Sequence, residues 1–175
     1  SFEKLSSAAK ARSFTVAGLA SEHLLSVAHS ELTNAIVEGT KMSDFAARLE
    51  ERFKSAGVVP LNTSHVETIF RTNLLTSYNV GRKAEMTTPD ALKLRPYWLV
   101  RTVKDDRQRD THKAVDGWVL RATDPFWRNV GGPPWGFNCR CRTTTIRGEK
   151  LGDRVIHIGA EIRGLPDPGF DPVGL

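Results

Sequence analysis

The sequence has little cysteine and no long apolar run. Only two of its 175 residues are cysteine, too few for the disulfide framework of a small secreted domain. No apolar run approaches the ~18 to 20 residues that a membrane-spanning helix needs. No positively charged segment followed by an apolar stretch opens the chain, so no secretory signal is visible. We therefore expect reduced thiols, synthesis in the cytoplasm and no membrane partner.

The overall composition is that of a folded protein. Hydrophobic residues make up 39% of the chain and charged residues 26%, which excludes the composition typical of disordered chains. A length of 175 residues suits one domain, or one domain with an appendage, and is enough to bury a sizeable core. There is no internal repeat and no low-complexity tract.

Positive charge is concentrated in one third of the chain. Residues 95–154 contain 13 lysines and arginines against 7 aspartates and glutamates, and most of the basic residues are arginine. The rest of the chain is nearly neutral. Such a block indicates an acidic partner, such as DNA phosphate or an acidic protein surface. The alternative is a solvated surface whose charges pair with one another.

The N-terminal half has helical periodicity. Apolar residues recur at three- and four-residue spacing and predict three helices, over residues 21–38, 44–57 and 64–86. Gly39 is expected to end the first helix and Ser43 to cap the second. Ser64 and Glu67 have the spacing of a capping box at the start of the third helix, which Pro89 follows.

After residue 96 the period changes from helical to alternating. The pattern predicts short strands over residues 97–103, 118–123, 139–147 and 154–163. One helix is expected between the first two strands, over residues 105–117. Irregular chain is predicted over residues 124–138 and in the tail from residue 164. The predicted class is α+β, with a helical N-terminal half followed by a small antiparallel sheet, one short helix and long loops.

Both cysteines lie in the segment C-R-C-R. If this segment is a strand, Cys139 and Cys141 point to one face, while Arg140 and Arg142 point to the other. Residues two apart on a strand hold their Cβ atoms too far apart for an unstrained disulfide. The pattern therefore predicts two free thiols side by side.

Two thiols on one face supply half of a tetrahedral zinc site. The other two ligands are expected from the helix over residues 105–117, where His112 and Asp116 share a face at i and i+4. Asp106 and Asp110 are the alternative acidic ligands. The spacing is not the C-x₂-C of common zinc knuckles, and two small buried cysteines in a core are the competing interpretation.

The same helix is unusually dense in charged residues. Asp106, Arg107, Arg109, His112 and Asp116 fall within eleven residues. One interpretation is an ion-pair network that holds the helix to the sheet. The other is an enzyme, a metal-dependent nuclease or a toxin-like effector, with His112 as general base and Arg107 or Arg109 binding phosphate.

Three segments follow one another along the chain: R-T-N-L-L-T-S-Y-N-V-G-R from residue 71, D-R-Q-R-D-T-H-K-A-V-D-G from residue 106, and P-P-W-G-F-N-C-R-C from residue 133. Together they resemble the phage Mu F-like head morphogenesis family of minor capsid proteins. The tail P-G-F-D-P-V-G is similar to the closing segment of that family but lacks its asparagine. Besides the cysteines, the motif residues are Arg71, Tyr78, Asn79, Arg82, Asp106, Arg107, Arg109, His112, Asp116, Gly117 and Asn138.

The resemblance covers about residues 64–173 and implies a function. It assigns residues 63–175 to a head morphogenesis domain and leaves residues 1–62 as an N-terminal helical region. It implies a minor capsid protein of a tailed bacteriophage or prophage, without an enzymatic activity of its own. The expected partners are portal and capsid proteins, with packaged DNA contacted through Arg140 and Arg142. The expected location is the virion, in the capsid interior or at the portal vertex, and the host cytoplasm during assembly.

Overall fold

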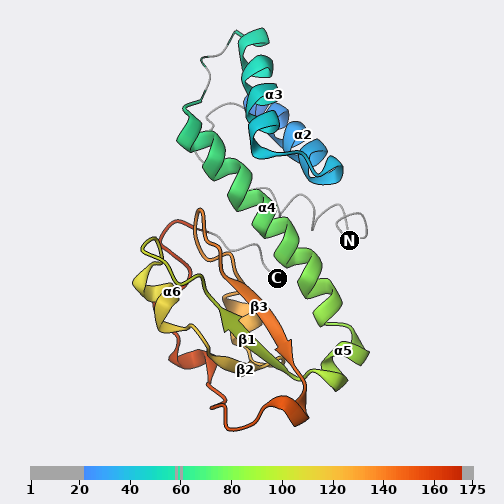
Figure 1. Ribbon diagram of the computed structural model, residues 1–175, viewed down its shortest axis with the longest axis vertical. Coiled ribbons are helices and arrows are strands. Elements are labelled where there is room, and N and C mark those ends of the chain that lie inside the picture. The colour runs from blue at the N-terminus through green and yellow to red at the C-terminus, as the bar shows by residue number, and fades with distance from the viewer. Residues whose placement is uncertain (1–21, 58, 60, 171–175) are drawn as a thin grey trace. The chain divides into compact units, whose positions relative to one another are not determined.

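The structure is a computed structural model that describes residues 22–57, 59 and 61–170 (Figure 1). Within these residues six α-helices, mostly N-terminal, accompany one three-stranded antiparallel sheet, so the predicted α+β class is confirmed. The chain divides into two compact units, residues 1–77 and 78–175. The boundary predicted between residues 62 and 63 stays a prediction. No described helix is both long enough and apolar enough to cross a membrane.

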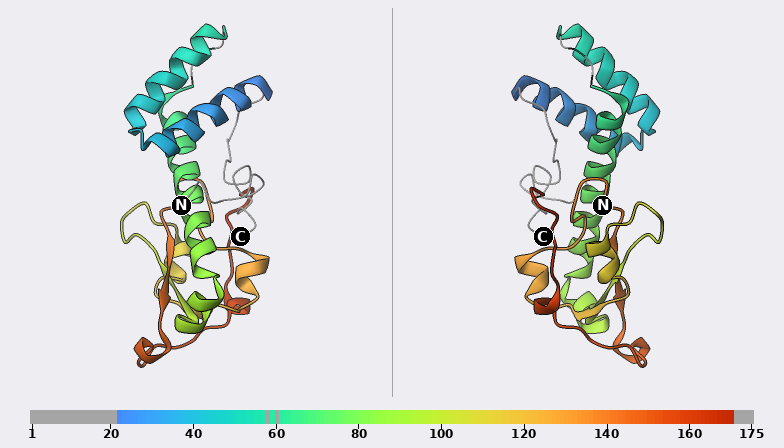
Figure 2. Two further views of the ribbon diagram at one scale, coloured as in Figure 1. Left: turned by 90° about the vertical axis from the view of Figure 1, so that its right-hand side faces the viewer. Right: turned by 90° about the vertical axis from the view of Figure 1, so that its left-hand side faces the viewer.

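The first unit is built from helices. Helices α2 (Glu22–Glu38) and α3 (Met42–Ser55) cross each other, as the side views show (Figure 2). They pack together with the first part of α4 (Thr63–Met86). Their apolar stripes meet because residues three and four apart share a helix face. The buried core consists of Ala28, Leu32, Ala35, Phe45, Leu49, Phe53, Val66, Ile69 and Phe70.

The predicted ends of these helices are partly confirmed. The left-handed Gly39, with φ of +67°, follows α2 as expected. The two serine caps are wrong. Lys41 precedes α3, and the Ser43 hydroxyl donates to the Asp44 carboxylate instead of accepting a hydrogen bond from a helix amide. The α4 helix starts at Thr63, one residue before the predicted start, because Asn62, also a good capping residue, accepts a hydrogen bond from the His65 amide at 2.8 Å.

The second unit contains the sheet. Its strands are β1 (Tyr97–Arg101), β2 (Val119–Arg121) and β3 (Arg142–Ile146), in the order β2-β1-β3. Trp98 of β1 lies opposite Leu120 of β2 and Thr145 of β3. One face of the sheet covers a core of Met86, Trp98, Val100, Val115, Leu120, Phe126, Trp127, Trp135, Cys139 and Cys141. The cysteines are therefore part of the hydrophobic core.

Three short helices accompany these strands: α5 lies between α4 and β1, and α6 and α7 lie between successive strands. Helix α5 (Pro89–Leu94) was not predicted; Thr88 caps it by accepting a hydrogen bond from the Ala91 amide. Helix α6 (Asp110–Ala114) is the shortened form of the predicted helix over residues 105–117. Helix α7 (Phe126–Asn129) lies in the predicted loop. Two 3₁₀ turns, η2 (Gly148–Lys150) and η3 (Gly159–Glu161), follow β3.

Two of the predicted strands need correction. The predicted strand over residues 139–147 begins only at Arg142, because the left-handed Asn138 (φ 57°) turns the chain and the Cys139 amide donates to the Gly136 carbonyl. The strand predicted over residues 154–163 is wrong. Only one bridge, between Ile156 and Val119, forms there, and the chain then turns into η3.

Candidate functional site

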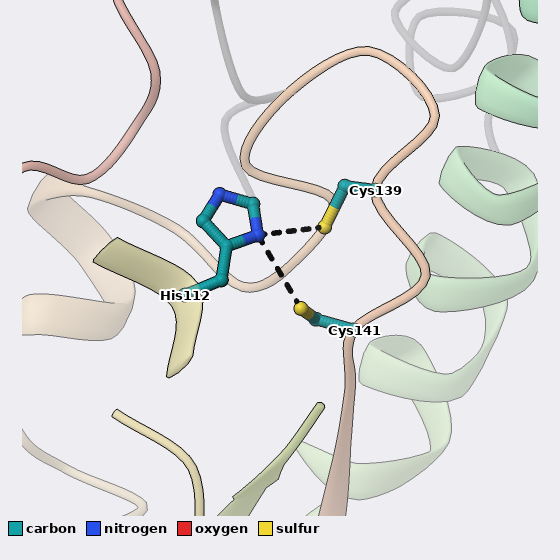
Figure 3. Close-up of side chains that lie close together, drawn as sticks. All are labelled: His112, Cys139 and Cys141. Carbon is teal, nitrogen blue, oxygen red and sulfur yellow. Dashed lines mark hydrogen bonds between the residues drawn. The ribbon is translucent and has the colours of Figure 1, made fainter. Parts of the chain in front are cut away.

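Three buried side chains converge beside the sheet. His112 comes from α6, while Cys139 and Cys141 come from the turn before β3. The His112 Nδ1 atom lies 3.6 Å from the Cys139 Sγ atom and 3.5 Å from the Cys141 Sγ atom (Figure 3). The three residues are 2%, 2% and 4% exposed, and both cysteines are free thiols. The expected pairing of the thiols with His112 is thus present, although a turn produces it and not a strand.

The second nitrogen of the imidazole ring also has a partner. His112 Nε2 lies 3.2 Å from the Oδ1 atom of Asp167, which comes from the tail. The Asp167 Oδ2 atom accepts from Arg109 Nε at 3.0 Å, and Arg109 donates to the Phe137 carbonyl at 2.7 Å. The Asp167 amide donates to the Trp135 carbonyl at 2.8 Å. The tail is therefore fixed over the outer edge of His112.

Asp167 was not among the predicted site residues. It stands 55 positions from His112, in a segment that periodicity describes only as irregular. It lies directly before the tail segment P-G-F-D-P-V-G, which resembles the closing segment of the head morphogenesis family, but it is not part of that segment.

Gly136 allows this approach of the tail. A Cβ atom at residue 136 would overlap the carboxylate of Asp167. Close approach of a side chain to backbone is one of the reasons that a position requires glycine. The glycine in P-P-W-G-F-N-C-R-C thus serves the contact between the cysteine turn and the tail.

The three groups perturb one another's protonation. The hydrogen bond from Cys141 holds the pKa of Cys139 well below its usual range, against the effect of burial and with help from His112. Cys139 and burial raise the pKa of Cys141. Burial disfavours the imidazolium of His112, but the hydrogen bond and charge of Cys139, with the charge of Asp167, outweigh it and raise the pKa of His112. The surroundings therefore favour loss of one proton from the thiol pair.

Asp116, predicted as a ligand, lies outside this group. Its Oδ1 atom accepts from the Thr102 amide at 2.9 Å, and its Oδ2 atom lies 3.3 Å from the Lys104 ammonium. The i,i+4 argument assumed that the helix runs through residue 116, but α6 ends at Ala114. Asp106 and Asp110, the alternative ligands, are exposed and are not in the group.

The arginines of the cysteine segment have different surroundings. Arg140 binds Asp105 through two hydrogen bonds of 2.6 and 2.7 Å, so an internal ion pair occupies it. Arg142 is exposed and lies directly opposite the exposed Arg101 in the pairing of β1 with β3. Like charges in directly opposed positions repel each other unless an anion lies nearby. Arg107 is also exposed.

The sequence comparisons agree with these motifs. Residues 27–144, more than half of the chain, match the family model described as Phage Mu protein F like protein. The chain belongs to this family. Its site turn and α6 both lie within the matched residues.

Two relatives of the Mu F-like chain cover nearly all of its length. It is 31% identical over 171 residues to the Mu-like prophage FluMu F protein of Haemophilus influenzae. The matched segment covers 91% of this chain and 40% of the relative. It is 31% identical over 173 residues to the putative capsid assembly protein F of Escherichia phage Mu, covering 90% of this chain and 38% of the relative. The chain therefore spans about two fifths of these relatives. No solved structure matches it.

The first motif of the Mu F-like chain lies on α4. Arg82 donates to the Thr143 carbonyl of β3 and to the Tyr78 hydroxyl, each at 3.1 Å, and the neighbouring Asn79 is buried. Arg71, about three turns before Arg82, forms an exposed ion pair with Glu67 at 2.5 Å. The C-terminal part of this motif therefore fixes helix α4 to the sheet. In the second motif, Gly117 has a left-handed backbone conformation, with φ of +81°, before β2.

The site of the Mu F-like chain suits ion binding better than general-base catalysis. A general base needs a free nitrogen within reach of substrate, whereas His112 is buried and both of its ring nitrogens have partners. Two thiols and one imidazole form a donor set for a soft divalent ion. Among the described residues, these three are the group of histidine, cysteine and acidic side chains placed to share an ion.

Proposed function

We propose that this chain is a head-assembly module of a minor capsid protein of a tailed phage or prophage. The observation that carries the proposal is the Mu F-like family match over residues 27–144, together with a 31% identical relative named as a putative capsid assembly protein. In this proposal the chain acts with portal and capsid proteins in the host cytoplasm and stays in the virion, inside the capsid or at the portal vertex. It has no catalytic turnover of its own.

The helical first unit is the proposed docking surface for these partner proteins. Among the described residues, its core consists of side chains from α2, α3 and the start of α4. Apolar side chains still remain on its outside: Val37 is 60% exposed and Leu74 40%. Amphipathic helices commonly present such residues to a groove of a partner protein.

The second unit is the proposed DNA contact. Because Arg140 is paired with Asp105, the proposal assigns the phosphate contact to Arg142 and its cross-strand neighbour Arg101. Contacts of this kind bind phosphate without reading sequence. In the same proposal, Cys139, Cys141 and His112 form a structural centre that a zinc ion would close.

A binding experiment tests the proposed partners. The purified chain should bind the purified portal or major capsid protein of its own phage, and replacing Val37 and Leu74 with Ser should weaken that binding. Replacing the exposed Val155, 68% exposed and outside the proposed docking unit, is the matched control. Absence of binding to both proteins, with cleavage of DNA or RNA in Mg²⁺, Mn²⁺ or Zn²⁺, would favour the enzyme interpretation instead.

A further inference from the structure

The distances within the Cys139, Cys141 and His112 group are those of a metal site. Zinc binds thiolate sulfur at about 2.3 Å and imidazole nitrogen at about 2.0–2.1 Å, and a tetrahedral angle then separates sulfur from nitrogen by about 3.5 Å. The structure has 3.6 and 3.5 Å for these two separations, and all three ligand atoms lie within 4.8 Å of one another. An ion would fit between the ligand atoms with little movement of the chain.

The donor set selects the ion. Two thiolates and one imidazole are soft and borderline ligands, which favour Zn²⁺ over the oxygen-binding Mg²⁺ and Ca²⁺. The burial of both thiols in the hydrophobic core suits a structural ion, since an ionised thiolate there needs a compensating positive charge.

Asp167 has a separate part in this site. A histidine that binds metal through one nitrogen usually donates its other N–H to a carboxylate or carbonyl, which fixes the tautomer and the ring orientation. The 3.2 Å contact of Asp167 with Nε2 places the proton there and leaves the Nδ1 lone pair facing the thiols. Asp167 is thus a positioning residue and not a ligand, because it lies on the far side of the ring.

A small cavity adjoins the three side chains. The three ligand residues line it together with Gln108, Arg109 and Asn138, and its volume is about 20 Å³. This is room for about one water molecule. The polar side chains that line the cavity can form hydrogen bonds with that water molecule.

We propose that Cys139 Sγ, Cys141 Sγ and His112 Nδ1 bind one Zn²⁺, with water as the fourth ligand and Asp167 orienting the imidazole. This deepens the structural role proposed for the group and does not depend on head assembly. Binding releases the thiol protons to solvent. The ion joins α6 to the turn before β3, across 27 and 29 residues of sequence.

Metal analysis of the purified chain tests the ligand set directly. Protein prepared under reducing conditions should contain about one zinc per chain by mass spectrometry of the elements. After exchange with Co²⁺, it should show the visible bands of a tetrahedral site and the near-ultraviolet bands of thiolate bound to cobalt. Cys139→Ser and Cys141→Ser should each lose these bands, whereas His157→Gln, in a histidine stacked on Trp118, should keep them. Wild-type protein that takes up neither Zn²⁺ nor Co²⁺ would overturn the site.

A second variant tests the positioning role without removing a ligand. Asp167→Asn should weaken zinc affinity by about 10–100-fold, as loss of such outer partners does, while the exposed Asp153→Asn should leave it unchanged. Competition with a chromophoric chelator measures both on protein shown to be folded by circular dichroism. Equal affinities of wild type and Asp167→Asn would contradict the role of Asp167. Failure to bind portal or capsid would leave these results as they are, so the two proposals fail separately.

Discussion

At the scale of single residues, Gly136 determines how closely the tail approaches the site. Gly136→Ala places a Cβ atom on the Asp167 carboxylate and should lower the free energy of unfolding by about 1–3 kcal/mol, as overpacking does. Gly148→Ala is the matched control, since a Cβ atom there meets no atom within 4 Å. Urea denaturation of the three proteins compares them. Equal destabilisation by both substitutions would mean that the close contact is not the cause.

Lys83 gives a prediction of pH dependence. Burial lowers its pKa from 10.5 to about 8, and its ammonium donates to the Trp127 carbonyl at 3.4 Å. Below pH 8 the Lys83 side chain is charged in both the folded and the unfolded chain, so burial of this charge lowers the free energy of unfolding by its full amount. Between pH 8 and 10.5 the unfolded chain binds more protons at this residue, so its destabilising effect decreases as pH rises.

The test compares Lys83→Met with wild type across this range. The stability of the variant relative to wild type should be highest below pH 8 and should fall as pH rises towards 10.5. The exposed Lys93→Met should show no such trend, which separates the effect from general alkaline destabilisation. A constant difference between Lys83→Met and wild type over the whole range would show that the lysine is not desolvated.

At the scale of elements, Arg82 connects α4 with β3. Arg82→Met removes its bond to the Thr143 carbonyl. Because hydrogen bonds made by charged groups contribute about 1.5–3 kcal/mol, the free energy of unfolding should fall by about that amount. Arg71→Met removes only an exposed pair with Glu67 and should cost about 0.5 kcal/mol or less. Chemical denaturation measures both, and similar losses for the two variants would contradict the connecting role of Arg82.

The sequence predicts the elements that local periodicity determines, but not those that depend on a tertiary contact. The long helices α2, α3 and α4 follow from apolar periodicity alone, and β1 and β2 follow from alternation. The predicted strand over residues 154–163 alternates equally well, but the Gly159 amide donates to Asp124 of another loop. That tertiary contact carries no local signal.

The candidate site was likewise predictable only in part. The two thiols and His112 were found because their residue types are rare or reactive. Asp116 was misplaced because the pattern could not show that α6 ends at Ala114. Asp167 was missed because no spacing rule pairs an irregular tail with a helix 55 residues earlier.

At the scale of the whole molecule, the concentration of arginines predicts how DNA binding depends on salt. Log affinity should fall linearly with log salt concentration, by about 0.9 per phosphate contact. Replacing Arg101 and Arg142 with Ala should reduce that slope by about 2. Arg140→Ala should change it less, because Asp105 already neutralises that arginine. Fluorescence anisotropy at several salt concentrations measures the slopes, and binding that ignores salt would contradict the phosphate contact.

Head assembly is the central claim, and sedimentation of assembled particles tests it most directly. The chain should be expressed with the portal and major capsid proteins of its phage, and the particles separated on a density gradient. The account predicts that the chain sediments with the particles at low copy and depends on the portal for doing so. A chain that stays wholly at the top of the gradient, while complete particles form and sediment without it, would contradict the account.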